Sequence, residues 1–97
     1  MTKQTILKTL QDRQDDIRRF HVKDLALFGS FARDENTESS DLDFVVNFTE
    51  KTFDNYMDLK NYLENLFKRR VDLVIADSIK PRLRPQILGG AIHAPGL

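Results

Sequence analysis

Two stretches decide how this chain folds, Leu27–Arg33 (LFGSFAR) and, after a polar gap, Asp41–Phe48 (DLDFVVNF). The first closes a short apolar run, which predicts a buried strand over 25–28 that ends at Gly29. A short helix is expected next, with Ser30 as its N-cap. Glycine lets backbone N–H groups approach an anion closely, and the start of a helix leaves N–H groups free. Gly29 and Ser30 are therefore candidate ligands of phosphate groups.

The second stretch alternates apolar and polar residues, which predicts a strand over 41–48. Leu42, Phe44 and Val46 share one buried face, and Asp41, Asp43 and Val45 project from the opposite face. The same alternation returns in Val71–Ile75 (VDLVI), which predicts a third strand that carries Asp72. If the two strands are neighbours, all three carboxylates lie on one polar face.

Carboxylates this close together repel, unless a cation lies between them or one of them holds a proton. Oxygen ligands favour magnesium or manganese, and magnesium typically binds one or two carboxylates plus substrate phosphates. Asp41 and Asp43 are thus candidate metal ligands. Asp72 is expected to complete a two-metal site or to take the proton from an attacking hydroxyl. Arg33, one turn after Ser30, is placed to offset phosphate charge. The pattern predicts metal-dependent chemistry on a nucleoside triphosphate.

The rest of the chain predicts an α/β protein of the α+β kind. Apolar residues recur at helical spacing over 4–20 and again after Thr52, and Pro85 suits the first turn of a short last helix ending near Gly89. The expected order is α-β-(short α)-β-α-β-α. It gives one domain over residues 1–97, a small mixed β-sheet with helices packed on one face. The other face is left open around the aspartates.

The composition is that of a globular protein, with 40% hydrophobic and 31% charged residues among 97. Fifteen basic residues balance fifteen acidic ones, so direct nucleic-acid binding by the whole molecule is not expected. The basic clusters, Lys68–Arg70 and Lys80, Arg82 and Arg84, are interpreted as solvated surface. No membrane-spanning stretch or signal-peptide core is found, and cysteine is absent, which favours a cytoplasmic protein.

A simpler interpretation is that Gly-Ser is an ordinary turn and Asp-x-Asp only makes an exposed strand soluble. Aspartate is disfavoured in strands, however, and here three aspartates stand in or beside apolar runs. The functional interpretation is therefore preferred.

The stretches GSFAR (29–33), SDLDFVV (40–46) and VDLV (71–74) resemble the minimal nucleotidyltransferases of the DNA polymerase β superfamily. The similarity extends to RPQIL (84–88), which resembles the last helix of the family. One position departs from the pattern, because Asp34 stands where many relatives carry glycine. The resemblance implies a polymerase β-like nucleotidyltransferase fold.

The resemblance also implies that Asp41 and Asp43 bind Mg²⁺, that Gly29 and Ser30 bind the triphosphate of ATP, and that Asp72 is the third catalytic carboxylate. It further implies an antitoxin that transfers AMP to a tyrosine of a HEPN-domain ribonuclease toxin and so neutralises it. Two alternatives stay open. The chain could neutralise the partner by binding and occlusion without catalysis, or transfer a nucleotide to a small molecule or to RNA.

Overall fold

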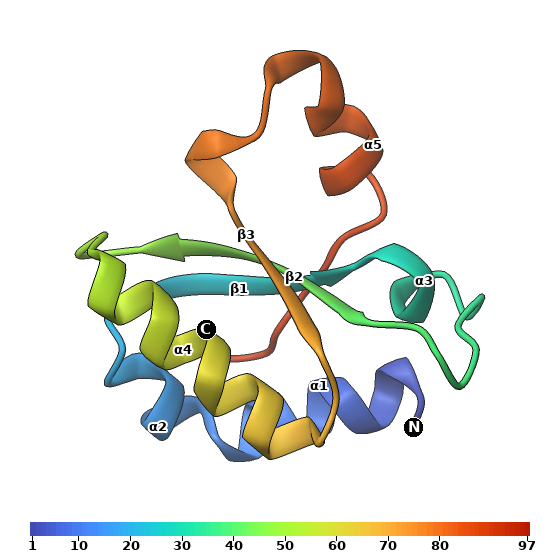
Figure 1. Ribbon diagram of the computed structural model, residues 1–97, viewed down its shortest axis with the longest axis horizontal. Helices are drawn as coiled ribbons and strands as arrows, with labels where there is room; N and C mark the ends of the chain where they lie inside the picture. The colour runs from blue at the N-terminus through green and yellow to red at the C-terminus, as the bar shows by residue number, and fades with distance from the viewer.

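The computed structural model describes residues 1–97. Its centre is a four-stranded mixed sheet in the order β3-β2-β1-β4, in which β2 and β3 are parallel and the other pairs antiparallel (Figure 1). The predicted α+β class with a small mixed sheet is confirmed, and the helices within 3–18 and 53–67 pack on one face of it. In chain order the elements are α1 (Lys3–Asp12), α2 (Gln14–Arg18), β1 (Val22–Phe28), α3 (Gly29–Ala32), β2 (Leu42–Phe48), α4 (Phe53–Phe67), β3 (Val71–Ile75), η1 (Ala76–Ser78), η2 (Pro81–Leu83), α5 (Arg84–Leu88) and β4 (Ile92–His93).

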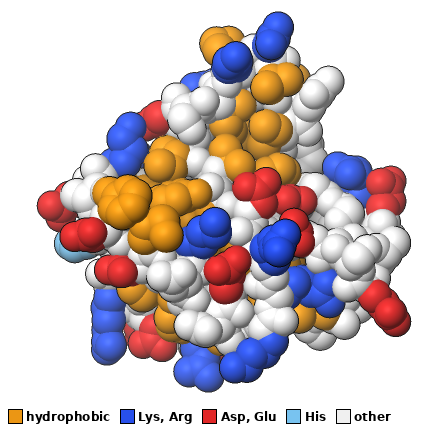
Figure 2. Space-filling view, in the orientation of Figure 1, with side chains coloured by type: hydrophobic (Ala, Val, Ile, Leu, Met, Phe, Trp, Pro, Cys, Tyr) orange, Lys and Arg blue, Asp and Glu red, His pale blue; other side chains and the backbone are white.

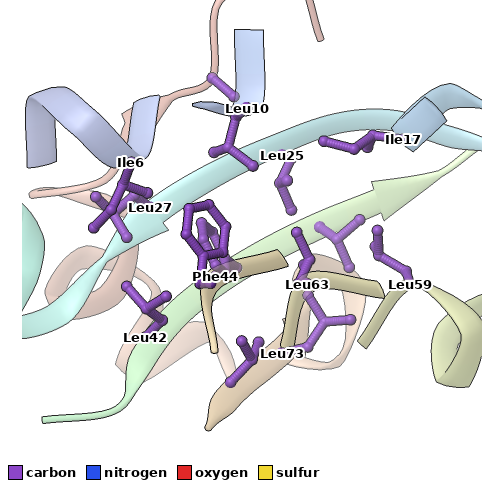
Figure 3. Packing of buried hydrophobic residues seen from close by; sticks show 14 of the residues in the cluster. Ile6, Leu10, Ile17, Leu25, Leu27, Leu42, Phe44, Leu59, Leu63 and Leu73 are labelled. Atoms are coloured by element: carbon purple, nitrogen blue, oxygen red, sulfur yellow. The ribbon is translucent and has the colours of Figure 1, made fainter. Parts of the chain in front are cut away.

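The main core lies between the sheet and the layer formed by α1, α2 and α4 (Figure 1). Figure 3 shows Phe44 of β2 surrounded by leucine and isoleucine side chains from the strands and from these helices. Each such fully buried side chain contributes about 1.5–3 kcal/mol to folding. The residues labelled there are Ile6, Leu10, Ile17, Leu25, Leu27, Leu42, Phe44, Leu59, Leu63 and Leu73, and all are at most 3% exposed.

Helix α4 begins where the sequence predicts. Thr52 is its N-cap, and its hydroxyl accepts a hydrogen bond from the N–H of Asn55 at 3.1 Å. In the first turn of the helix, the hydroxyl of Tyr56 donates to the carbonyl oxygen of Leu73 at 2.7 Å. The carboxylate of Glu64 accepts from the N–H of Val71 at 3.0 Å. Helix α4 therefore fixes both the start and the middle of β3.

The opposite face of the sheet is partly covered by the segment from η1 to β4, which rises from the end of β3 and returns to pair with β1 (Figure 1). A small second cluster forms there, with Ala26, Val45 and Ile79 buried. The face is thus less open than the sequence predicts, and the part that stays uncovered lies toward Asp43. Figure 2 shows apolar side chains exposed along this C-terminal segment, and Phe53 at the start of α4 is 77% exposed.

Three expectations about the elements need correction. The predicted helix over 4–20 is two helices, because the chain leaves helical geometry at Arg13 (φ −109°, ψ 15°). The first strand is longer than 25–28, since it starts at Val22. The short strand β4 was not predicted at all. None of the helices is both long and apolar enough to cross a lipid bilayer.

Candidate active site

The register of the sheet places Asp43 and Asp72 side by side. In the parallel pair β2 and β3, Asp43 is the direct partner of Asp72, and in the antiparallel pair β1 and β2 it is the partner of Phe28. Residues paired in this way project from the same face of a sheet. Asp41 precedes β2 by one residue, is exposed and follows the same alternation. Gly29 comes directly after Phe28, so the end of β1 also lies at this point.

The three carboxylates act on one another electrostatically. The pKa of Asp43 is raised above its usual value, first because the side chain is partly buried and then because Asp72 and Asp41 repel its negative charge. The guanidinium of Arg33 acts in the opposite direction and lowers this pKa. A cation placed among these oxygens would remove the repulsion that raises the pKa.

Gly29 leaves room for the Asp43 carboxylate. Its φ is +74°, in the left-handed region that favours glycine. A Cβ atom at this position would lie 2.9 Å from Cγ of Asp43 and would overlap its Oδ2. Any side chain at position 29 would therefore push the Asp43 carboxylate out of its place, which explains the choice of glycine by packing as well as by backbone geometry.

Ser30 is not the N-cap of the short helix, so this prediction is wrong. Phe28 occupies the N-cap position and makes no side-chain capping bond, and Ser30 lies inside α3. The physical reason is the left-handed turn at Gly29, after which the helix starts two residues earlier than expected. The Ser30 carbonyl accepts from the N–H of Glu35 at 2.9 Å. Its hydroxyl makes no hydrogen bond within the protein, which leaves it available to a ligand.

Arg33 follows at the end of α3 and is exposed. Its Nε donates to the Glu35 carboxylate at 3.0 Å. Exposed ion pairs of this kind contribute little to stability, so a more highly charged phosphate could replace Glu35 as its partner at small cost. The carboxylate of Asp34 points elsewhere and pairs with Nζ of Lys3 at 3.1 Å. Asp34 has φ +58°, in the left-handed region that favours glycine.

The carboxylate oxygens at this point suit a hard cation that also binds phosphate oxygens of a ligand. No group of three or more His, Cys, Asp or Glu side chains in the chain is arranged to hold a metal ion by itself. Mg²⁺ does not require such a group, because it usually takes one or two carboxylates and completes its shell with water and phosphate oxygens. Asp41 and Asp43 offer that number of oxygen ligands, and Asp72 is adjacent to Asp43.

The sequence pattern does not identify Arg69 as a site residue, and its interpretation as solvated surface is wrong. Its Nη1 donates to the carbonyl oxygens of Glu38 at 3.0 Å and Ser40 at 2.8 Å. Its guanidinium also lies over the ring of Phe31, 5.3 Å from the ring centroid. Arg69 thus joins α3 and the loop before Asp41 to the start of β3. Only its place next to the VDLVI strand could have drawn attention to it.

Comparison with known proteins assigns the family. Residues 4–93 match the model of the nucleotidyltransferase domain. The protein adenylyltransferase MntA of Thermococcus cleftensis is 34% identical over 95 residues, which is 96% of each chain. A chain of Methanocaldococcus jannaschii, provisionally named a protein adenylyltransferase, is 39% identical over 84 residues, or 75% of this chain and 84% of its own.

Solved structures agree. A provisionally assigned minimal nucleotidyltransferase superposes with a TM-score of 0.75 at 39% identity, covering 95% of both chains. A chain in the complex of a tri-AMPylated HEPN toxin with MNT antitoxin from Shewanella oneidensis superposes with a TM-score of 0.65. The match covers 94% of this chain and 73% of that one, and at 19% identity it shows a similarity of fold. With its strand order, its Gly-Ser turn and its paired aspartates, this chain belongs to the nucleotidyltransferase domain family, among the minimal nucleotidyltransferases.

Proposed function

We propose that this chain is a magnesium-dependent protein adenylyltransferase, an antitoxin that transfers AMP from ATP to a tyrosine of a HEPN-domain toxin. The observation that carries the proposal is the direct pairing of Asp43 with Asp72 beside the Gly29 turn. Relatives support the choice of reaction, since MntA at 34% identity is a protein adenylyltransferase. A fold relative is an antitoxin bound to a tri-AMPylated HEPN toxin, and another was solved with AMP-PNP.

In this proposal, the N–H groups after Gly29 and the hydroxyl of Ser30 bind the triphosphate, and Arg33 offsets its charge. Asp41 and Asp43 would hold Mg²⁺, with Asp72 as a third ligand or as the base. When bound, the ion neutralises charge that develops on the phosphates. A tyrosine oxygen attacks the α-phosphorus, the bond from this phosphorus to the bridging oxygen breaks, and pyrophosphate leaves. Asp72 takes the proton of the attacking hydroxyl.

The test is intact mass spectrometry of a purified HEPN-domain partner after incubation with this protein, Mg²⁺ and ATP. We expect one or more mass steps of an AMP unit. Asp43→Asn should reduce the rate by roughly 100-fold or more, because a ligand that carries charge is lost. The exposed Asp58 of α4 supplies a matched control, since Asp58→Asn makes the same chemical change away from the site and should leave the rate unchanged.

The same experiment distinguishes the alternative mechanism. If the partner stays unmodified, remains bound and is still inhibited, neutralisation is by occlusion and the catalytic proposal is wrong. Full activity of Asp43→Asn would also contradict the assignment of the site.

A further inference from the structure

A pocket of about 290 Å³ lies on the same face of the sheet as Asp43 and Asp72, beneath the C-terminal segment. Its floor is formed by Ala26 and Val45, which are direct partners in the pair of β1 and β2. The neighbouring pair on this face is Phe28 with Asp43. Because alternate residues of a strand are about 7 Å apart, the pocket begins one such step from the aspartates.

The geometry of in-line transfer decides which part of a substrate reaches this pocket. Across the sheet, the end of β1 at Gly29, then Asp43 on β2 and Asp72 on β3 follow one another. In the proposed reaction the leaving pyrophosphate lies toward Gly29 and the attacking hydroxyl comes from the side of Asp72. The attacking hydroxyl oxygen and the bridging oxygen that leaves with the pyrophosphate lie in line on opposite sides of the α-phosphorus. The nucleoside is attached through another oxygen, so it extends across that line, either along the strands or away from the sheet, and the direction along the strands leads to this pocket.

We propose that this pocket binds the nucleoside of the triphosphate, with the adenine base over Ala26 and Val45 and its exocyclic amine toward Asn47. This inference rests on the proposed function, since it needs the triphosphate at Gly29 and Ser30. To the proposed function it adds a binding site for the nucleoside and a structural basis for selectivity among nucleotide bases.

The charges of the lining favour a nucleoside over phosphates. Two carboxylates, Asp24 and Asp77, face one guanidinium, Arg84, so the pocket has no surplus positive charge to hold an anion. The small side chains of Ala26, Ala76 and Ala91 contribute apolar lining that leaves room for a planar ring.

The polar end of the pocket is oriented to accept hydrogen bonds. Nδ2 of Asn47 donates to Oδ1 of Asp24 at 2.9 Å, and both side chains are half-buried. This bond fixes the amide, so its Oδ1 and the second oxygen of Asp24 remain as acceptors. Acceptors of this kind match the exocyclic amine of adenine, which is a donor. Hypoxanthine carries a carbonyl oxygen there and would face them with a second acceptor.

The first experiment fills the pocket and measures binding by titration calorimetry in the presence of Mg²⁺. Ala91→Phe should weaken the binding of ATP by at least roughly tenfold. It should leave the affinity for inorganic tripolyphosphate unchanged, because tripolyphosphate has no nucleoside. Gln86→Phe is the matched control, since Gln86 is exposed on α5 and does not line the pocket. It should change neither affinity.

The second experiment leaves the protein intact and changes the base. The unaltered protein should bind ATP roughly tenfold more tightly than ITP. Asn47→Leu, which removes the amide at similar volume, should reduce this preference to roughly threefold, because the acceptor of Asp24 remains. Equal binding of ATP and ITP by the unaltered protein would overturn the proposed contact with the amine.

The outcomes separate the pocket from the proposed function. If the unaltered protein binds neither ATP nor tripolyphosphate, the proposed function fails and this inference falls with it. If AMP transfer proceeds and Ala91→Phe binds ATP normally, only the pocket assignment is overturned. That assignment is also overturned if Ala91→Phe raises the KM for the protein partner and not for ATP, because the pocket then receives the acceptor.

Discussion

Asp43 is the residue at which activity and stability oppose each other. Its pKa is raised by burial and by the charges of Asp72 and Asp41, so the folded protein holds this proton more tightly than the unfolded chain does. Ionisation of Asp43 therefore disfavours the folded state, and its contribution to the free energy of unfolding falls as the pH rises from 3.8 through the raised pKa. The charge that the proposed metal site needs is one that the free protein holds at a cost.

We predict that Asp43→Asn raises the melting temperature of the metal-free protein by a few degrees at neutral pH, although it slows transfer by roughly 100-fold or more. The difference should vanish at a pH below 3.8, where Asp43 of the unaltered protein is also neutral. Thermal unfolding followed by circular dichroism in EDTA measures it. A variant that melts at a lower temperature than the unaltered protein at neutral pH would contradict this view of Asp43.

Gly29 is predicted to tolerate no side chain. Gly29→Ala would force alanine to adopt the left-handed conformation that glycine has here, which costs about 1–2 kcal/mol, and would displace the Asp43 carboxylate. A displacement of that kind should lower the rate of AMP transfer by roughly 100-fold. Gly90→Ala is the control, because a Cβ at Gly90 meets no atom within 4 Å. Comparable rates for the two variants would rule out the close packing of Gly29 on Asp43 as a requirement.

At the scale of elements, Arg69 connects the three segments that carry the site. It binds the carbonyl oxygens of Glu38 and Ser40 before Asp41, stacks on Phe31 of α3 and stands three residues before Asp72. Loss of charge-assisted bonds of this kind costs about 1.5–3 kcal/mol. Arg69 touches no substrate in the proposed mechanism, so it is a positioning residue.

Arg69→Ala should lower kcat for AMP transfer and raise the Mg²⁺ concentration needed for half-maximal rate, because the segment before Asp41 is no longer held. Arg69→Lys should recover part of both, since an ammonium group can still donate to one carbonyl. The exposed neighbour provides the control, and Arg70→Ala should match the unaltered protein. If Arg69→Ala only lowers the melting temperature and leaves the Mg²⁺ requirement unchanged, Arg69 has a structural role alone.

At the scale of the whole molecule, the strands and the long helix could be predicted because their burial follows simple periods. The alternation in 42–48 and 71–75 is present in the structure as one face under the helices and one face toward the C-terminal segment. That alternation predicts that Asp43 and Asp72 share a face if their strands are neighbours, and the structure adds both the pairing and the register that place them side by side. Thr52 could be recognised as a cap by its own chemistry.

The remainder depends on contacts that leave no pattern along the chain. Strand β4 has only two residues, too few for an alternation, and its pairing with Ala26 and Leu27 is long-range. The break at Arg13 has neither glycine nor proline to mark it. Arg69 binds backbone carbonyls, which every residue possesses, so no partner could be read from residue types. The pocket exists only because the C-terminal segment returns over the sheet.

The central claim is that one site, built on Asp41, Asp43 and Asp72, transfers the α-phosphorus of ATP to a protein hydroxyl. The most direct measurement incubates the protein with Mg²⁺, a HEPN-domain partner and ATP labelled at either the α- or the γ-phosphorus. It quantifies the label that enters the partner and the pyrophosphate that is released. We predict that α-label alone enters the partner, that one pyrophosphate is released for each AMP added, and that Asp72→Asn abolishes both. Entry of γ-label, or transfer that survives Asp72→Asn, would contradict the account.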